Sequence, residues 1–333
     1  MTIRDVARQA NVSIASASRA LNGLNNVTEV TRARVISAAS ELRYVPHTGA
    51  RSLSTSRTDT IGLILPELHG EFFSEIIRGV DQAASARGLH LLVSNSHGDP
   101  AEAALAIRAM RGRADGLLIM SPHLDAVLMA HNLPDDLPTV LMNTPVEGGR
   151  RAGVRVDNHA GALAAVRHLL DTGRRRIAHI AGPQANFESC ERRDGWLAAL
   201  TAAGADAARL ERGDFSEESG FEAGRRLVEA ASPPDAVFAA NDMMAVGCLR
   251  ALREAGLRAP EDVAVAGFDD IPLARLVGLT TVRTGIADLG RRALERLTAI
   301  IDGEPIDETT EITRPELVVR DSTGGAPATA AKQ

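Results

Sequence analysis

The sequence predicts a small all-α head followed by a larger α/β body, built from two lobes with parallel sheets. Short amphipathic helices separated by turn residues occupy the first 60 residues. From residue 60 onward, apolar runs alternate with amphipathic stretches, which is typical of parallel sheets covered by helices. A chain of 333 residues with 44% hydrophobic residues can fill more than one core.

The first predicted helix begins with a capping box formed by Thr2 and Asp5, in which the side chain of each residue accepts a hydrogen bond from the backbone N–H of the other. Apolar residues then recur at helical spacing from Ile3 to Ala10. Asn11 tolerates the left-handed backbone that a sharp turn requires, and Ser13 can cap the next helix.

The second and third predicted helices complete a small core. The second is expected to turn three residues inward: Ala17, Ala20 and Leu21. The third, near Glu29 to Leu42, is expected to contribute four: Val30, Val35, Ile36 and Ala39.

The body is expected to contain about ten strands. This is more than a single lobe usually contains, so two similar lobes are favoured. The strand-like runs are 61–65, 89–94, 116–120, 139–142, 177–181, 236–240 and 263–268. Helical segments between them cover 73–87, 102–111, 161–170, 192–203, 218–230 and 243–255.

Charge distinguishes the head from the body. Residues 1–60 carry eight arginines against four acids, whereas the whole chain has a net charge of −6. A basic head on an acidic body indicates a polyanionic partner for the head alone. Charge by itself would equally fit a chance cluster of solvated arginines.

The outward face of the second helix carries side chains suited to the major groove of DNA. Arg19 can bridge the two acceptors of guanine, and Ile14 and Ala15 can meet a thymine methyl group. The remaining expected DNA contacts in the helices, several of them hydroxyls suited to the phosphate backbone, are Thr2, Ser13, Ser16, Ser18 and Asn22.

The motif Thr-Ile-Arg-Asp-Val-Ala-Arg-Gln-Ala-Asn-Val-Ser, followed by Ser-Arg-Ala-Leu-Asn, Tyr-Val-Pro and Ala-Arg-Ser-Leu, resembles the lactose-repressor (LacI/GalR) family. The resemblance extends from Thr2 to about Val319. It implies a cytoplasmic transcriptional repressor that binds double-stranded operator DNA as a homodimer, together with a body similar to periplasmic sugar-binding proteins. No leucine heptads follow Val319, which favours a dimer over a tetramer.

The resemblance also implies a hinge over 47–58 that folds on the operator. Leu53 would wedge into the minor groove and bend the duplex, and Arg51 is expected to contact DNA beside it. Thr48-Gly49 weakens the hinge helix, because glycine costs about 1 kcal/mol of helix propensity. Without the resemblance, a plain linker would explain this segment.

Ligand contacts are expected where strand-like runs end, in the cleft between the lobes. The resemblance assigns Arg192, in Arg-Arg-Asp-Gly-Trp, as a donor to ligand hydroxyls or a carboxylate, and Asp269 as an acceptor from sugar hydroxyls. The other expected ligand contacts are Phe73, Asn143, Phe215 and Asn241. Ordinary structural roles are the alternative: Asp242 and Asn158 as helix caps, and Phe73 as part of the core.

The predicted domains are therefore a helix-turn-helix head (1–46), the hinge (47–58), a two-lobed body (59–320) and a disordered tail (321–333). Within the body, the N-lobe comprises 59–157 and 285–314, and the C-lobe comprises 158–284 and 315–320. Ligand closure is expected to separate the paired hinges and release the operator; a corepressor that tightens binding is the alternative.

Two other classes of protein compete with this interpretation. An enzyme is disfavoured because the chain has no dinucleotide loop, phosphate loop or Gly-x-Ser-x-Gly elbow, so no catalytic residues, metal or cofactor are expected. A transport protein is disfavoured by the DNA-reading head and by a start that lacks the apolar core of a signal peptide. No apolar run approaches the ~20 residues of a membrane span, so no membrane partner is expected.

Overall fold

The computed structural model describes residues 1–22, 26–44, 57–122, 133, 136–144, 152–205, 209–305 and 309–324. The chain forms two compact units. The first contains Met1–Thr60 with Gly112–Asp115, and the second contains Ile61–Arg111 and the chain from Gly116 onward. The expected all-α head and parallel α/β body are confirmed.

The head consists of three helices: α1 (Ile3–Gln9), α2 (Ile14–Leu21) and α3 (Glu29–Glu41). The predicted caps form, because Asp5 accepts from the Thr2 backbone N–H at 2.9 Å and Ser13 accepts from the Ser16 N–H at 3.1 Å. Asn11 takes the left-handed conformation with φ 51°. These local signals set the two turns that orient α2.

The core of the head is built from small side chains: Val6, Ala7, Ala10, Ala17, Ala20, Val35, Ala38 and Ala39. Two residues that we expected in this core are instead exposed, Val30 by 72% and Ile36 by 53%. Helical geometry explains the error, since the buried face of α3 runs through Val35, Ala38 and Ala39, and Ile36 lies about 100° from Val35.

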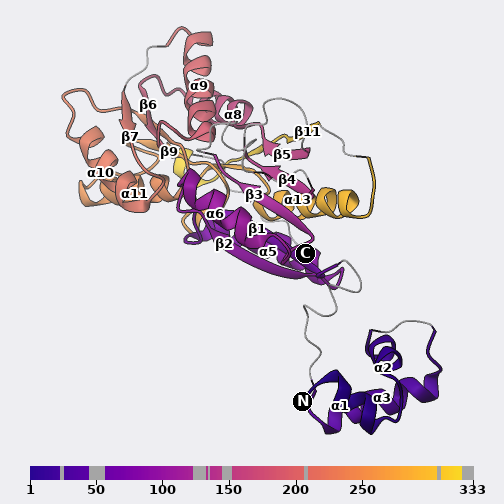
Figure 1. Ribbon diagram of the computed structural model, residues 1–333. Helices are drawn as coiled ribbons and strands as arrows, with labels where there is room; N and C mark the ends of the chain where they lie inside the picture. The colour runs from indigo at the N-terminus through magenta and orange to yellow at the C-terminus, as the bar shows by residue number, and fades with distance from the viewer. Residues whose placement is uncertain are drawn as a thin grey trace, which may run out of the picture. The chain divides into compact units, whose positions relative to one another are not determined.

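Two parallel sheets organise the body (Figure 1). The first has the order β11-β5-β4-β3-β1-β2, with β1 (Thr60–Leu65), β2 (His90–Asn95), β3 (Gly116–Met120), β4 (Thr139–Met142), β5 (Ala152–Val156) and β11 (Thr310–Thr313). The second has the order β7-β6-β8-β9, with β6 (Ile177–Ala181), β7 (Leu210–Arg212), β8 (Ala236–Ala239) and β9 (Ala264–Ala266). We call these sheets, with their helices, the first and second lobes.

Helices pack on both lobes. The first lobe has α5 (Glu71–Ser85), α6 (Pro100–Met110) and α13 (Ile286–Ile301). The second has α8 (Asn158–Asp171), α9 (Phe187–Ala202), α10 (Glu217–Val228), α11 (Asp242–Glu254) and the short α12 (Pro272–Leu276). Successive residues of β6 face opposite layers: Ile177 packs with α8 and α9, whereas Ala178 packs with α10 and α11.

The end of the described chain differs from the predicted disordered tail. β10 (Thr281–Arg283) pairs antiparallel with β12 (Glu316–Val318), and Asp321–Thr323 forms a 3₁₀ helix. Ser322 is buried, and its Oγ accepts from the Thr280 N–H at 2.8 Å and donates to the Val265 carbonyl at 2.7 Å. The expectation that disorder begins at residue 321 is therefore wrong, because hydroxyl side chains here complete the edge of the second sheet; residues 325–333 lie outside the described chain.

Candidate functional site

A cleft of about 610 Å³ lies at the carboxyl ends of the strands of both lobes. Parallel sheets place their ligands at this edge, because the loops that follow the strands converge there. The first lobe contributes Pro66, Glu67, His69, Gly70, Glu71, Phe72, Phe73, His97, Gly98, Met120 and Pro122. The second contributes Pro183, Asn186, Glu188, Arg192, Asp214, Phe215, Ser216, Glu217, Asn241, Met243, Asp269 and Ile271.

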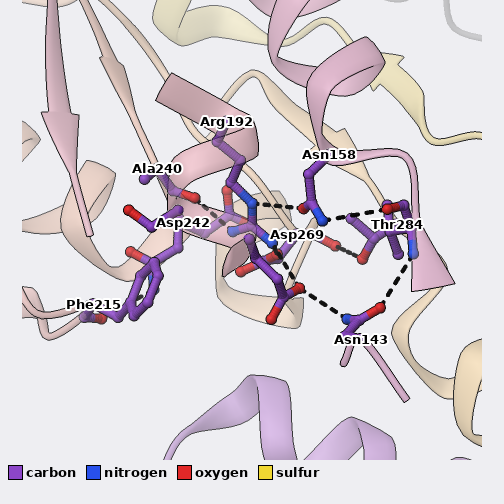
Figure 2. A network of polar contacts seen from close by, with 12 residues as sticks. Asn143, Asn158, Arg192, Phe215, Ala240, Asp242, Asp269 and Thr284 are labelled. Atoms are coloured by element: carbon purple, nitrogen blue, oxygen red, sulfur yellow. Dashed lines mark hydrogen bonds and ion pairs between the residues drawn. The ribbon is translucent and has the colours of Figure 1, made fainter. Parts of the chain in front are cut away.

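Arg192, on α9, lies at the centre of a buried polar network (Figure 2). Its Nη1 donates to the Ala240 carbonyl at 2.7 Å, and its Nε donates to Asn158 Oδ1 at 2.8 Å. The guanidinium also lies 3.9 Å from the centre of the Phe268 ring. These contacts hold the side chain in one orientation, with its remaining edge toward two carboxylates.

Those carboxylates belong to Glu188 and Asp269, and the Arg192 Nη2 lies 3.4 Å from an oxygen of each. Burial raises the pKa of Glu188 to about 7 and that of Asp269 to about 6, although Arg192 opposes both shifts. The resemblance predicted Arg192 and Asp269 but missed Glu188. A signal was available, since Glu188 is one helical turn before Arg192 on the same face.

Asn143 does not line the cleft, contrary to the expected direct ligand contact. It is buried where the lobes meet, with its Nδ2 donating to Glu188 Oε1 at 2.9 Å and its Oδ1 accepting from the Val156 N–H at 3.1 Å. The two ends of this side chain join β5 of the first lobe to α9 of the second. Asn143 therefore positions Glu188 across the lobe junction.

The other expected ligand residues line the cleft. Asn241 caps α11 by accepting from the Met244 N–H at 2.9 Å, and its Nδ2 donates to the Phe215 carbonyl at 3.0 Å. Phe215 has φ 73°, and its ring lies so close to Gly182 that a Cβ there would clash. The half-buried Phe73, on the first lobe, supplies an aromatic wall for the same cleft.

The two suggested helix caps are corrected by one position. Asp157, rather than Asn158, caps α8 by accepting from the Ala160 N–H at 2.9 Å. Asn241, rather than Asp242, caps α11. Asp242 is fully buried and accepts from the Ile271 N–H at 2.9 Å and the Thr281 hydroxyl at 2.5 Å, while burial raises its pKa well above the usual range.

In the head, the exposed face of α2 presents Ile14, Ala15 and Arg19 to solvent. Ser16 and Ser18 are half-buried, and Ser13 uses its hydroxyl in the cap. Two arginines counted in the basic head are engaged internally, since Arg32 donates to the Ala20 carbonyl of α2 and Arg34 donates to the carbonyls of Ala10 and Asn11 in the turn after α1. The expected contacts at Arg51 and Leu53 lie outside the described residues.

Among the described residues, neither a metal site nor a membrane-spanning helix is found. No group of three or more His, Cys, Asp or Glu side chains in this part of the chain is arranged to hold a metal ion. No helix within the described ranges combines the length and apolarity required to cross a bilayer.

Comparison with known proteins connects both units to one family. Residues 2–47 match the bacterial regulatory proteins of the lacI family, and residues 166–323 match a periplasmic binding protein-like domain. The HTH-type transcriptional regulator CelR of Thermobifida fusca is 37% identical over 96% of this chain and 98% of its own length. The HTH-type transcriptional repressor CytR of Escherichia coli (strain K12) is 34% identical over 98% of this chain and 97% of its own.

Solved structures agree with these relatives. The lac repressor dimer bound to operator and the anti-inducer ONPF has a TM-score of 0.88 at 28% identity, covering 97% of this chain and 99% of that one. A CelR–cellobiose complex has a TM-score of 0.72 at 34% identity, with the same coverage. The chain belongs to the LacI family of bacterial regulatory proteins and is a DNA-binding transcriptional regulator.

Proposed function

We propose that the chain is a repressor that binds an inverted-repeat operator as a homodimer and releases it when a saccharide occupies the cleft. The observation that carries this proposal is that the buried Arg192 and Asp269 line the same cleft as the aromatic side chains of Phe73 and Phe215. Charged or polar groups beside aromatic walls suit the hydroxyl edges and apolar faces of a sugar ring. A regulator of transcription acts where the DNA is, so we place the protein in the cytoplasm.

The names of related proteins support a saccharide ligand. One solved relative is a complex with cellobiose, and another relative is the ribose operon repressor of Escherichia coli (strain K12), 36% identical over 89% of this chain. The lac repressor structure contains a dimer on its operator, which supports the same assembly here. We assign base recognition to Arg19, Ile14 and Ala15 on the exposed face of α2.

Regulation follows from unequal binding to two arrangements of the lobes. A ligand can shift this equilibrium only by the difference between its affinities for the two arrangements. Because Asn143 joins the lobes through Glu188 beside Arg192, occupation of the cleft acts directly on the lobe junction. We propose that this shift separates the hinges at 47–58, including Leu53 and Arg51. The affinity of the two heads for one operator then decreases.

DNA binding is tested with the full-length protein and DNA selected from a library of inverted repeats. Arg19→Ala is expected to weaken binding to the selected sequence about 10- to 100-fold and to relax its specificity. Arg8→Ala removes the same charge from an exposed position on α1 and should weaken binding to all sequences alike. Equal losses in both variants on every sequence would refute base reading by Arg19.

Ligand control is tested by adding saccharides to the operator complex. Release supports an inducer, whereas tighter binding would replace it with a corepressor. Deletion of residues 1–58 should abolish DNA binding and leave saccharide binding intact. Loss of both would contradict the assignment of DNA binding to the head and of saccharide binding to the body. Turnover of a bound saccharide by the purified protein would instead favour an enzyme.

A further inference from the structure

The positive charge of Arg192 is already compensated within the protein. Glu188, Arg192 and Asp269 are at most 5% exposed, and both carboxylates lie 3.4 Å from the Arg192 Nη2. The Nε and Nη1 edges donate to Asn158 and Ala240. The guanidinium therefore resembles the centre of an acid–base–acid triad more than a free anion receptor.

One oxygen of this triad lacks a hydrogen bond. Asp269 Oδ1 is buried and has an ion-pair contact with Arg192, but no donor hydrogen-bonds to it. A buried acceptor without a donor is costly, and Asp269 lines the cleft. A ligand hydroxyl would satisfy this oxygen, whereas a ligand phosphate or carboxylate oxygen would repel it.

The rest of the cleft extends the same electrostatic bias. Among the described residues that line it, Arg192 is the one arginine or lysine, whereas six side chains are acidic: Glu67, Glu71, Glu188, Asp214, Glu217 and Asp269. Low-dielectric walls lined by one sign of charge focus the field inside a cleft. An anionic ligand would therefore meet unfavourable potential at the mouth and at the floor.

We infer that Glu188 is a specificity-determining residue that, together with Asp269, restricts the effector to saccharides without phosphate or carboxylate groups. The inference rests on the proposed saccharide-responsive function and adds the chemical class of the ligand. Glu188 acts by cancelling the charge that Arg192 would otherwise offer to an acid. Asn143 holds Glu188 in that position through the 2.9 Å hydrogen bond across the lobe junction.

Matched pairs of saccharides test this inference by calorimetry on the full-length protein at pH 8, where the Glu188 carboxyl, with its pKa of about 7, is mostly ionised. The pairs are cellobiose with cellobionate, ribose with ribose 5-phosphate, and glucose with glucose 6-phosphate and glucuronate. In every pair that binds, the uncharged member is expected to bind at least about tenfold more tightly, because like charges a few ångströms apart repel strongly in a partly buried site.

Glu188→Gln keeps the shape of the side chain and removes its charge. It is expected to reduce the preference for the uncharged member about tenfold, because Arg192 loses one of its two counter-charges. Glu222→Gln makes the same change of net charge on α10, where Glu222 is paired with Arg225 outside the cleft, and should leave the preference unchanged.

The outcomes separate the two proposals. Equal or tighter binding of the anionic members to the wild-type protein, or an unchanged preference in Glu188→Gln, would overturn the role of Glu188 while leaving saccharide control of the operator intact. Absence of binding by every member of every pair would overturn the proposed saccharide function, and this inference with it.

Discussion

The two lobes of the body share a parallel-sheet architecture but differ in what they bury. Every buried aspartate, glutamate and arginine in the described part of the chain lies in the second lobe: Glu188, Arg192, Glu211, Asp242 and Asp269. The buried polar residues of the first lobe, such as Asn143 and Ser96, are uncharged. The first lobe thus buries apolar and uncharged polar side chains, whereas the second carries a costly buried network of charged and acidic groups at the cleft, to which we assign the proposed selectivity for a ligand.

Removal of Arg192 should reduce stability the most, because it disrupts the buried network that distinguishes the second lobe from the first. Arg192→Ala would leave two buried carboxylates without their cation, together with unpaired groups on Asn158 and Ala240. We expect the free energy of unfolding to fall by about 3–5 kcal/mol, measured by urea denaturation. Arg193→Ala, which removes a neighbouring arginine paired with Asp194 at the surface, should cost less than about 1 kcal/mol. Equal losses in the two variants would contradict the account.

Neutralising Glu188 should remove an electrostatic cost instead. The pKa of Glu188 is about 7 in the folded protein against 4.5 for the free side chain, so the folded state retains a proton that the unfolded state loses. The contribution of Glu188 to stability is therefore expected to decrease as pH rises from 4.5 to 7. Glu188→Gln should exceed the wild-type protein in free energy of unfolding by up to about 3 kcal/mol at pH 8, and the difference should vanish near pH 4. Parallel pH profiles would contradict the buried-acid assignment.

A histidine in the same lobe should show the opposite pH dependence. His179, on β6, is fully buried against the rings of Phe238 and Trp196, and its Nδ1 donates to the Phe238 carbonyl at 2.8 Å. Burial lowers its pKa from 6.5 to about 4. Between these pH values the histidine is therefore protonated in the unfolded state and neutral in the folded state. Stability present above pH 6.5 is lost as pH falls toward 4, by about 2 kcal/mol at pH 5.

His179→Phe should keep the stacked ring and abolish this titration. Its urea midpoint is expected to change less between pH 7 and pH 5 than that of the wild-type protein. His159→Phe, on α8, serves as a control for the loss of a histidine elsewhere in the lobe. A wild-type acid response in His179→Phe would refute the assignment.

The smallest effect concerns a contact between the lobes. Glu71, at the start of α5, accepts from the Leu273 N–H of α12 at 3.0 Å. Glu71→Ala should lower the free energy of unfolding by about 1 kcal/mol and weaken saccharide binding a few-fold, because the observed arrangement of the lobes loses one hydrogen bond. Glu75→Ala, which removes a carboxylate paired with Arg78 on the same helix, should leave saccharide binding unchanged. Equal saccharide affinities in both variants would exclude a role for the contact between Glu71 and Leu273 in saccharide binding.

The fold was predictable where local patterns and tertiary packing agree. The caps at Asp5 and Ser13 and seven apolar runs correspond to observed helix starts and strands. Five short or partly polar strands were missed: β5, β7, β10, β11 and β12. Helix α13 was also missed as an element, although its apolar face packs against the first sheet. Burial of such segments depends on partners far away in the chain, which a local window does not contain.

The candidate site was predictable at positions carried by a family motif. Arg192, Asp269, Asn241, Phe215 and Phe73 all line the cleft, but their roles toward a ligand remain predictions. Asn143 was misplaced because its side chain turns toward Val156 and the second lobe, a direction that no spacing rule specifies. Trp196, the tryptophan of the Arg-Arg-Asp-Gly-Trp motif, is buried in the second lobe away from the cleft, with its Nε1 donating to the Ile177 carbonyl at 3.3 Å. Calorimetry is therefore a better ligand assay than its fluorescence.

The central claim is that binding of an uncharged saccharide in the cleft controls whether the heads remain bound to the operator. Fluorescence anisotropy of a selected inverted-repeat DNA, titrated with full-length protein and a saccharide shown by calorimetry to bind, tests it most directly. We predict that the saccharide lowers operator affinity at least tenfold in the wild-type protein and has little effect in Asp269→Asn, which still binds the operator without ligand. Saccharide binding with unchanged operator affinity in the wild-type protein would contradict the claim.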